Sequence, residues 1–238
     1  MTFPIGSTKI NVFPEKYLLP GDAMNTFRNT DIRWLTAALF WGSLWGAAEA
    51  TAGHILHLLR IPGLAGMVMF PLGVYFMAKA FKASGKIKII GLSALFASAI
   101  KLIDLAAPLS SPEAVINPAL AILCEALAVM GVLFLFKKEF TLPSLPVFSG
   151  AAFGWRIFFL GLVAVHQFLI GSSGIWDTGG VPLLRFMGLD PLVNVILLTF
   201  IFHRFNSRAA VSEKTFLYRF PAFAPLVFLA ALFLEWFI

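Results

Sequence analysis

Long apolar segments, most of them close to twenty residues, follow one another along most of the chain. A segment of about 20 apolar residues is long enough to cross the hydrocarbon core of a bilayer as a helix. Such segments run over 34–59, 63–80, 88–107, 117–136, 147–170, 187–204 and 221–238. Glycine, proline or basic residues separate them. The pattern predicts an all-α, polytopic transmembrane bundle of six to seven spans.

Prolines and the amino-terminal stretch modify this picture in three places. The last segment begins with Pro221 and Pro225 and barely reaches the length of a span. In the sixth, the pair Asp190-Pro191 predicts a break in the helix and a partly re-entrant course. Residues 1–33 hold several prolines and no long apolar run, which predicts a polar tail. We therefore expect one transmembrane domain over 34–238.

The overall composition excludes a soluble protein. Of the 238 residues, 59% are hydrophobic and only 13% are charged. A soluble domain is about 45–50% apolar and about 25% charged. With a single cysteine, the chain also lacks the means to build a disulfide framework.

Basic residues indicate how the bundle is oriented. Fourteen of the 18 Lys and Arg residues fall in segments on one side of the membrane, and two fall on the other. The fourteen are Lys9, Lys16, Arg28, Arg33, Lys79, Lys82, Lys86, Lys88, Lys137, Lys138, Arg204, Arg208, Lys214 and Arg219. The positive-inside rule then places the amino terminus in the cytoplasm and predicts a multi-pass protein of the cell membrane. The net charge of +6 follows from this bias and from contact with anionic lipid, so it gives no reason to expect nucleic acid as a partner.

Polar side chains interrupt the apolar spans. An ionisable group at bilayer depth costs about 2.5–3.5 kcal/mol and usually marks a site. The candidate ligand-binding residues are Glu49, His54, His57, Lys101, Asp104, Asn117, Glu125, His166 and Trp176. Most lie toward the outer ends of their spans, and Trp176 belongs to a glycine-rich outer loop that is able to close as a lid. The sequence therefore predicts a pocket that is open to the outside.

Two of these groups have simpler interpretations. Lys101 and Asp104 are three residues apart, a spacing that equally favours a pair with each other. Arg156, in the inner half of its span, equally suits a side chain that extends to the membrane interface or a structural link with Glu125.

Small residues at four-residue spacing line one face of the first span. Ala38, Gly42, Gly46 and Ala50 form this ladder, and Glu49 lies within the same arc. Because small residues allow helices to approach closely, we expect this face to be packed inside the bundle.

Several short stretches resemble one family of membrane proteins. These are the small-residue ladder, the run Leu64-Ala65-Gly66-Met67-Val68-Met69-Phe70-Pro71-Leu72-Gly73, and the run Ile116-Asn117-Pro118-Ala119-Leu120. Over about residues 34–205 the chain resembles the membrane-embedded substrate-binding (S) components of energy-coupling factor transporters. The resemblance implies a bundle of about six helices that captures a vitamin or metal ion from outside. It also implies a separate transmembrane subunit and two ATPases as partners, with the ladder as the docking surface.

Sequence motifs of common enzyme classes are absent. The chain has no Walker loop, no His-Glu-x-x-His, no Gly-x-Ser-x-Gly and no dinucleotide-binding fingerprint, so we predict binding of a small molecule rather than catalysis. Two alternatives remain open. His57 and His166 lie at similar depth and are able to ligate a b-type haem as cofactor, which predicts a redox subunit. The chain is also compatible with a structural subunit of a larger membrane complex.

Overall fold

The computed structural model describes residues 20–59, 61, 63–106, 112–136, 144–170, 180–205 and 221–237. Residues 33–238 form one compact unit, and the described residues 20–32 belong to a separate one. Apart from the start of the first helix, every described helix lies within residues 33–238.

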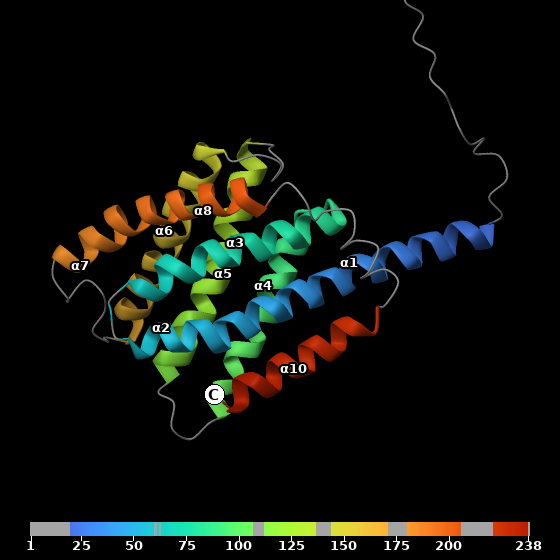
Figure 1. Cartoon of the computed structure of the whole chain (residues 1–238), viewed down its shortest axis with the longest axis horizontal. Coiled ribbons are helices and arrows are strands. Elements are labelled where there is room, and N and C mark those ends of the chain that lie inside the picture. The colour runs from blue at the N-terminus through green and yellow to red at the C-terminus, as the bar shows by residue number, and fades with distance from the viewer. Residues whose placement is uncertain are drawn as a thin grey trace, which may run out of the picture. The chain divides into compact units, whose positions relative to one another are not determined.

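The chain is built from helices alone in the part that the structure describes, which confirms the predicted all-α class (Figure 1). In order, they are α1 (Pro20–Ala48), the π-helical turn η2 (Glu49–Gly53), α2 (His54–Leu58), α3 (Leu64–Ser84), α4 (Lys88–Lys101), the 3-10 turn η3 (Leu102–Ala106), α5 (Pro112–Phe136), α6 (Leu145–Ile170), α7 (Gly180–Leu184), the π-helical turn η5 (Arg185–Leu189), α8 (Asp190–Phe205) and α10 (Phe223–Phe237).

Five helical stretches are long and apolar enough to cross a membrane. They are Leu64–Ser84, Lys88–Ala106, Ala114–Phe136, Leu145–Leu169 and Gly180–Arg204. The chain is therefore a multi-pass membrane protein. The first expected span is helical from α1 to α2 but is not one of the five found among the described residues. With 15 residues, α10 is about 22 Å long, which is shorter than the hydrocarbon core of about 30 Å.

The predicted break at Asp190-Pro191 is wrong. The helix continues from α7 through η5 into α8, and Pro191 is the second residue of α8. Pro191 is tolerated because the helix winds more widely just before it, and such a π-helical turn leaves a gap in the regular ladder of hydrogen bonds where a missing N–H costs little. The π-helical turn before it is closed by the backbone N–H of Asp190, which donates to the carbonyl of Arg185. Pro20 is the first residue of α1, where a missing N–H has no partner in any case, so the helix reaches back into the stretch expected to be a polar tail.

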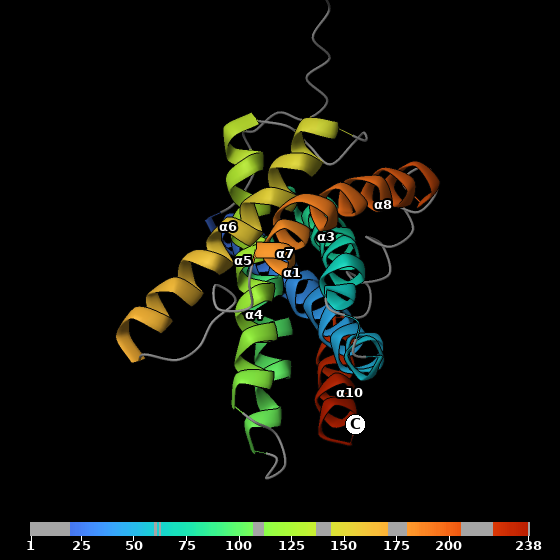
Figure 2. The ribbon, with the colours of Figure 1, turned by 90° about the vertical axis from the view of Figure 1, so that its left-hand side faces the viewer.

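The bundle core is aromatic and tightly enclosed. Helix α5 packs against both α4 and α6, while α3 packs against α4 and α8 (Figure 2). Trp45, Phe70 and Phe148 are fully buried or nearly so. The Trp155 ring stacks on Phe70 with centroids 5.8 Å apart.

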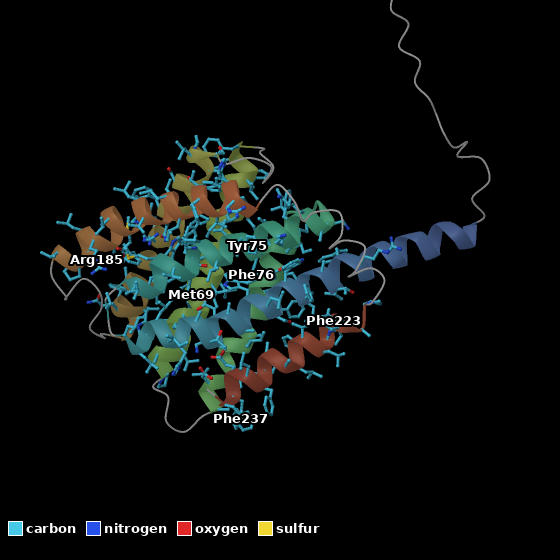
Figure 3. All side chains as sticks on the ribbon, in the orientation of Figure 1. Met69, Tyr75, Phe76, Arg185, Phe223 and Phe237 are labelled. Carbon is cyan, nitrogen blue, oxygen red and sulfur yellow. The ribbon has the colours of Figure 1, made fainter. Side chains whose placement is uncertain are left out.

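Large apolar side chains also cover the outside of the bundle. Phe134, Phe168, Val181 and Leu184 are each more than 70% exposed. A soluble protein rarely exposes so many large apolar groups, whereas a surface that faces lipid tails requires them. Figure 3 shows side chains projecting from every helix, with Phe223 and Phe237 at the two ends of α10.

The small-residue ladder of α1 packs inside the bundle, as its helical phase predicts. A Cβ atom on Gly42 would lie 2.5 Å from the Ser93 carbonyl oxygen, and one on Gly46 would lie 2.5 Å from the Ile100 side chain. Both contacts are with α4, so this face is occupied within the chain. The docking of a partner subunit on the ladder, which the resemblance implies, therefore has no free surface at these two positions.

We expect Gly42→Ala to destabilise the protein by about 1–3 kcal/mol, because the new methyl group meets a backbone carbonyl that is unable to move aside. Thermal unfolding in detergent measures this loss. Gly131→Ala is the matched control, since nothing lies within 4 Å of a Cβ at that position. Equal stability of the two variants would mean that α1 and α4 do not pack this closely.

Candidate functional site

Two carboxyl groups lie inside the bundle on different helices. Glu49 begins η2 and is 8% exposed, while Glu125 lies in the middle of α5 and is 4% exposed. They are close enough to interact electrostatically with each other. We call these two residues the carboxyl pair. The Glu125 Oε2 atom is buried and has no hydrogen-bond partner.

Glycine leaves the space that each carboxylate fills. A Cβ on Gly73 of α3 would lie 2.9 Å from Glu125 Oε2 and 2.8 Å from the Trp45 ring. A Cβ on Gly53 would lie 2.9 Å from Glu49 Oε2. The indole of Trp45, on a fully buried side chain, is close enough to Glu49 to interact with its carboxyl group. The carboxyl pair is therefore closely surrounded by the bundle, and Glu125 Oε2 is left without a hydrogen-bond partner.

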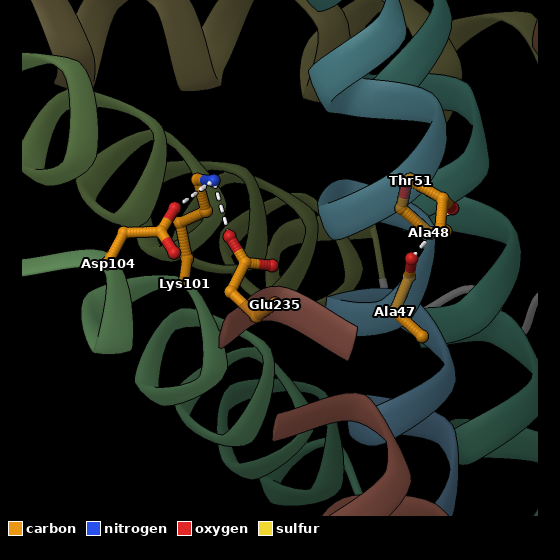
Figure 4. Close-up of polar contacts among 6 residues, drawn as sticks. All are labelled: Ala47, Ala48, Thr51, Lys101, Asp104 and Glu235. Carbon is orange, nitrogen blue, oxygen red and sulfur yellow. Dashed lines mark hydrogen bonds and ion pairs between the residues drawn. The ribbon is translucent and has the colours of Figure 1, made fainter. Parts of the chain in front are cut away.

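The helix changes its winding where Glu49 is placed. A π-helical turn often marks a functional site, because it widens the helix and displaces a side chain from its regular position. The Thr51 hydroxyl donates to the Ala47 carbonyl at 2.8 Å and also contacts the Ala48 carbonyl, which stabilises the junction between α1 and η2 (Figure 4).

An ion-pair cluster joins α4, η3 and α10. The Lys101 ammonium donates to Asp104 Oδ2 at 2.8 Å and to Glu235 Oε1 at 2.5 Å (Figure 4). The Glu235 side chain is only 2% exposed, although it lies near the end of the last helix. Lys101 and Asp104 thus pair with each other, which was the simpler of their two interpretations.

A second polar cluster surrounds Arg156 of α6, which is fully buried. Its guanidinium donates to the Asn194 side-chain oxygen of α8 at 2.7 Å and to the Ala152 carbonyl at 2.7 Å. The guanidinium also lies over the Trp155 ring, with 4.5 Å between its carbon and the ring centroid. Nearby, Arg185 forms an ion pair of 3.5 Å with Asp190, whose carboxylate is buried.

A proline explains why Asn194 binds α3. Pro71 lies inside α3 and lacks the N–H that would bond to the carbonyl four residues earlier. That carbonyl belongs to Met67, and the Asn194 Nδ2 group donates to it at 2.7 Å. The side-chain amide thus replaces the bond that Pro71 is unable to make, and the Arg156 cluster ties α3, α6 and α8 together.

The clusters and the carboxyl pair form one electrostatic series across the bundle. Lys101 interacts with Glu49 at one end of the series, and Arg156 interacts with Glu125 at the other. Arg156 interacts in turn with Asp190. No direct ion pair joins either member of the carboxyl pair to a base among the described side chains. The expected link between Arg156 and Glu125 is therefore electrostatic, and Arg156 makes its hydrogen bonds elsewhere.

The other predicted site residues are placed differently. His54 is half-buried, while His57, Asn117 and His166 are exposed. His57 still interacts electrostatically with Lys101. Trp176 lies outside the described residues.

The arrangement gives no support to a haem held by His57 and His166. Figure 2 separates α2, which carries the first histidine, from the end of α6 that carries the second. Among the described residues, no three His, Cys, Asp or Glu side chains gather closely enough to hold a metal ion.

Three site residues were not among the sequence candidates. Glu235 is an ionisable group inside a predicted span, and the rule that selected Glu49 applies equally to it. Asp190 was interpreted only as a helix breaker because Pro191 follows it. Asn194 carries no charge, and only the position of Pro71 on another helix shows why it is needed.

Comparison with protein-family models, with curated proteins and with solved structures found no match to this chain. The resemblance to the S components therefore stays a prediction.

Proposed function

We propose that the protein is an integral membrane solute-binding protein for uptake of a small molecule, with the carboxyl pair at the centre of its binding site. The observation that supports this is the series of charged groups that meets inside the bundle from η2, α4, α5, α6, α8 and α10. Intramembrane ionisable groups that face a bundle interior typically mark substrate or ion pathways. A purely structural bundle gains little from them, because each buried charge must be desolvated.

The proposed solute is vitamin-like or metal-related and carries at least one polar group that reaches Glu49 or Glu125. The unpartnered Glu125 Oε2 atom supplies an acceptor, and the Trp45 indole supplies an apolar wall. We also propose that energy comes from separate membrane and ATPase subunits, since this sequence contains no Walker loop.

Native mass spectrometry of the protein in lipid nanodiscs tests this proposal. We expect a small molecule to co-purify with the wild type and to be lost from Glu49→Gln and Glu125→Gln. Removing one charged partner of a buried contact weakens binding by about 2–5 kcal/mol. His166→Ala is the control, since His166 is exposed and should leave the bound molecule in place. A wild-type protein without any small molecule, or one equally loaded in all four forms, contradicts the proposal.

A further inference from the structure

The described buried charges do not balance. Among the buried side chains they comprise four carboxyl groups and one basic group. The acids are Glu49, Glu125, Asp190 and Glu235, and the base is Arg156. The half-buried Lys101 and Arg185 pair directly with Glu235 and Asp190. In a medium of low dielectric constant, an excess of negative charge is costly unless a cation or a proton neutralises it.

The excess falls on the carboxyl pair. Lys101 faces Glu49 from α4, but this ammonium already binds both Asp104 and Glu235 directly. Arg156 faces Glu125 from α6, but it also interacts electrostatically with Asp190. From α3 the pair meets Gly73, which carries no charge, and the charged groups of that helix, Lys79 and Lys82, lie nearer its carboxyl end. Neither base is therefore free to neutralise the pair.

The walls of the site favour a proton over a metal cation. A hard cation such as Na⁺ or Ca²⁺ requires a shell of several oxygen ligands. The pair offers four carboxylate oxygens at most, and the groups next to Glu125 are the Trp45 ring and the backbone of Gly73. Two carboxyl groups that share a site need no further ligand, because one of them retains its proton when both are unable to ionise together.

We propose that Glu49 and Glu125 share one bound proton at neutral pH and form a proton-binding site inside the bundle. The proposal concerns the same two residues as the proposed function, and its test needs no solute. The unpartnered Glu125 Oε2, buried against Gly73 and Trp45, is the oxygen atom that carries this proton or accepts it.

Infrared spectroscopy of the protein in nanodiscs detects this proton directly. We expect a carboxylic acid C=O band at neutral pH that shifts in D₂O and disappears at alkaline pH. Glu49→Gln and Glu125→Gln each remove or shift the band, because the remaining carboxyl group then ionises beside Lys101 or Arg156. Asp104→Asn is the matched control and keeps the band, since Asp104 lies outside the carboxyl pair and binds Lys101 at 2.8 Å. Absence of the band in the wild type, or its loss only in the control, overturns the proposal.

Thermal unfolding shows whether a variant has lost the band simply because it has misfolded. Gln is close in shape to a protonated Glu, so Glu125→Gln should unfold within a few degrees of the wild type at neutral pH. Raising the pH ionises both groups of the wild-type pair, so the wild type should lose stability relative to Glu125→Gln. A large loss in the variant at neutral pH, or stabilisation of the wild type alone by Na⁺, overturns the proton assignment. Because neither readout requires a solute, failure here is distinct from failure to find a co-purified molecule.

Discussion

Replacing Arg156 by Met should destabilise the protein by about 3–5 kcal/mol, because breaking a buried charge network leaves its other members without compensation. Asn194 would lose the donor to its side-chain oxygen, and Asp190 would lose the electrostatic support of a fully buried guanidinium. Met matches the length of the side chain, so the loss reports the charge and its hydrogen bonds more than the volume. Unfolding in detergent, followed by circular dichroism, measures the change.

Arg185→Met is the matched control for this prediction. The Arg185 side chain is 35% exposed, and its ion pair with Asp190 spans 3.5 Å, so water screens much of the interaction. We expect the control to lose no more than about 1 kcal/mol. If Arg156→Met unfolds no earlier than Arg185→Met, the Arg156 cluster does not hold α3, α6 and α8 together.

The membrane class and most helix positions follow from apolar length alone. Five of the expected spans coincide with helices to within a few residues, apart from the earlier starts of the fourth and sixth. The prediction was wrong at Asp190-Pro191, where a change in helix winding compensates for the backbone hydrogen bond that proline is unable to make. Pro191 suggested a break because its effect was judged without the π-helical turn that precedes it.

The site was predicted only in part, and there is a physical reason why some of its residues were missed. Desolvation cost selects individual residues from the sequence, which is how Glu49, Lys101 and Glu125 were identified. Their partners depend on helix packing. Glu235, more than a hundred residues away, binds Lys101 only because α10 lies against α4 and η3. Helical phase correctly indicated a packed face on α1, but the phase of one helix does not say which neighbour fills it.

Replacing Lys101 by Met should release α10 from the bundle. Lys101 is the base that Asp104 and Glu235 both bind, so its loss leaves two carboxylates close together without a counter-ion. We expect a loss of about 3–5 kcal/mol, as for other broken buried ion pairs. The effect should be concentrated in α10, because that helix lies at the edge of the bundle against η2, η3 and α4, with Phe223 against Phe40 of α1. Hydrogen exchange followed by mass spectrometry should show faster exchange over 223–237 in the variant.

A second substitution distinguishes the contribution of the charged groups that hold α10 from the contribution of its apolar contacts. Aromatic contacts also hold this helix, with Phe228 placed 5.9 Å from Phe96 and Phe223 placed 6.2 Å from Phe40 between ring centroids. Glu235→Gln added to Lys101→Met removes one uncompensated carboxylate and should therefore restore part of the protection in α10. If Lys101→Met leaves exchange over 223–237 unchanged, these aromatic contacts suffice and the ion-pair cluster does not retain the helix. If the double variant is less protected than Lys101→Met alone, repulsion between Asp104 and Glu235 is not what displaces α10.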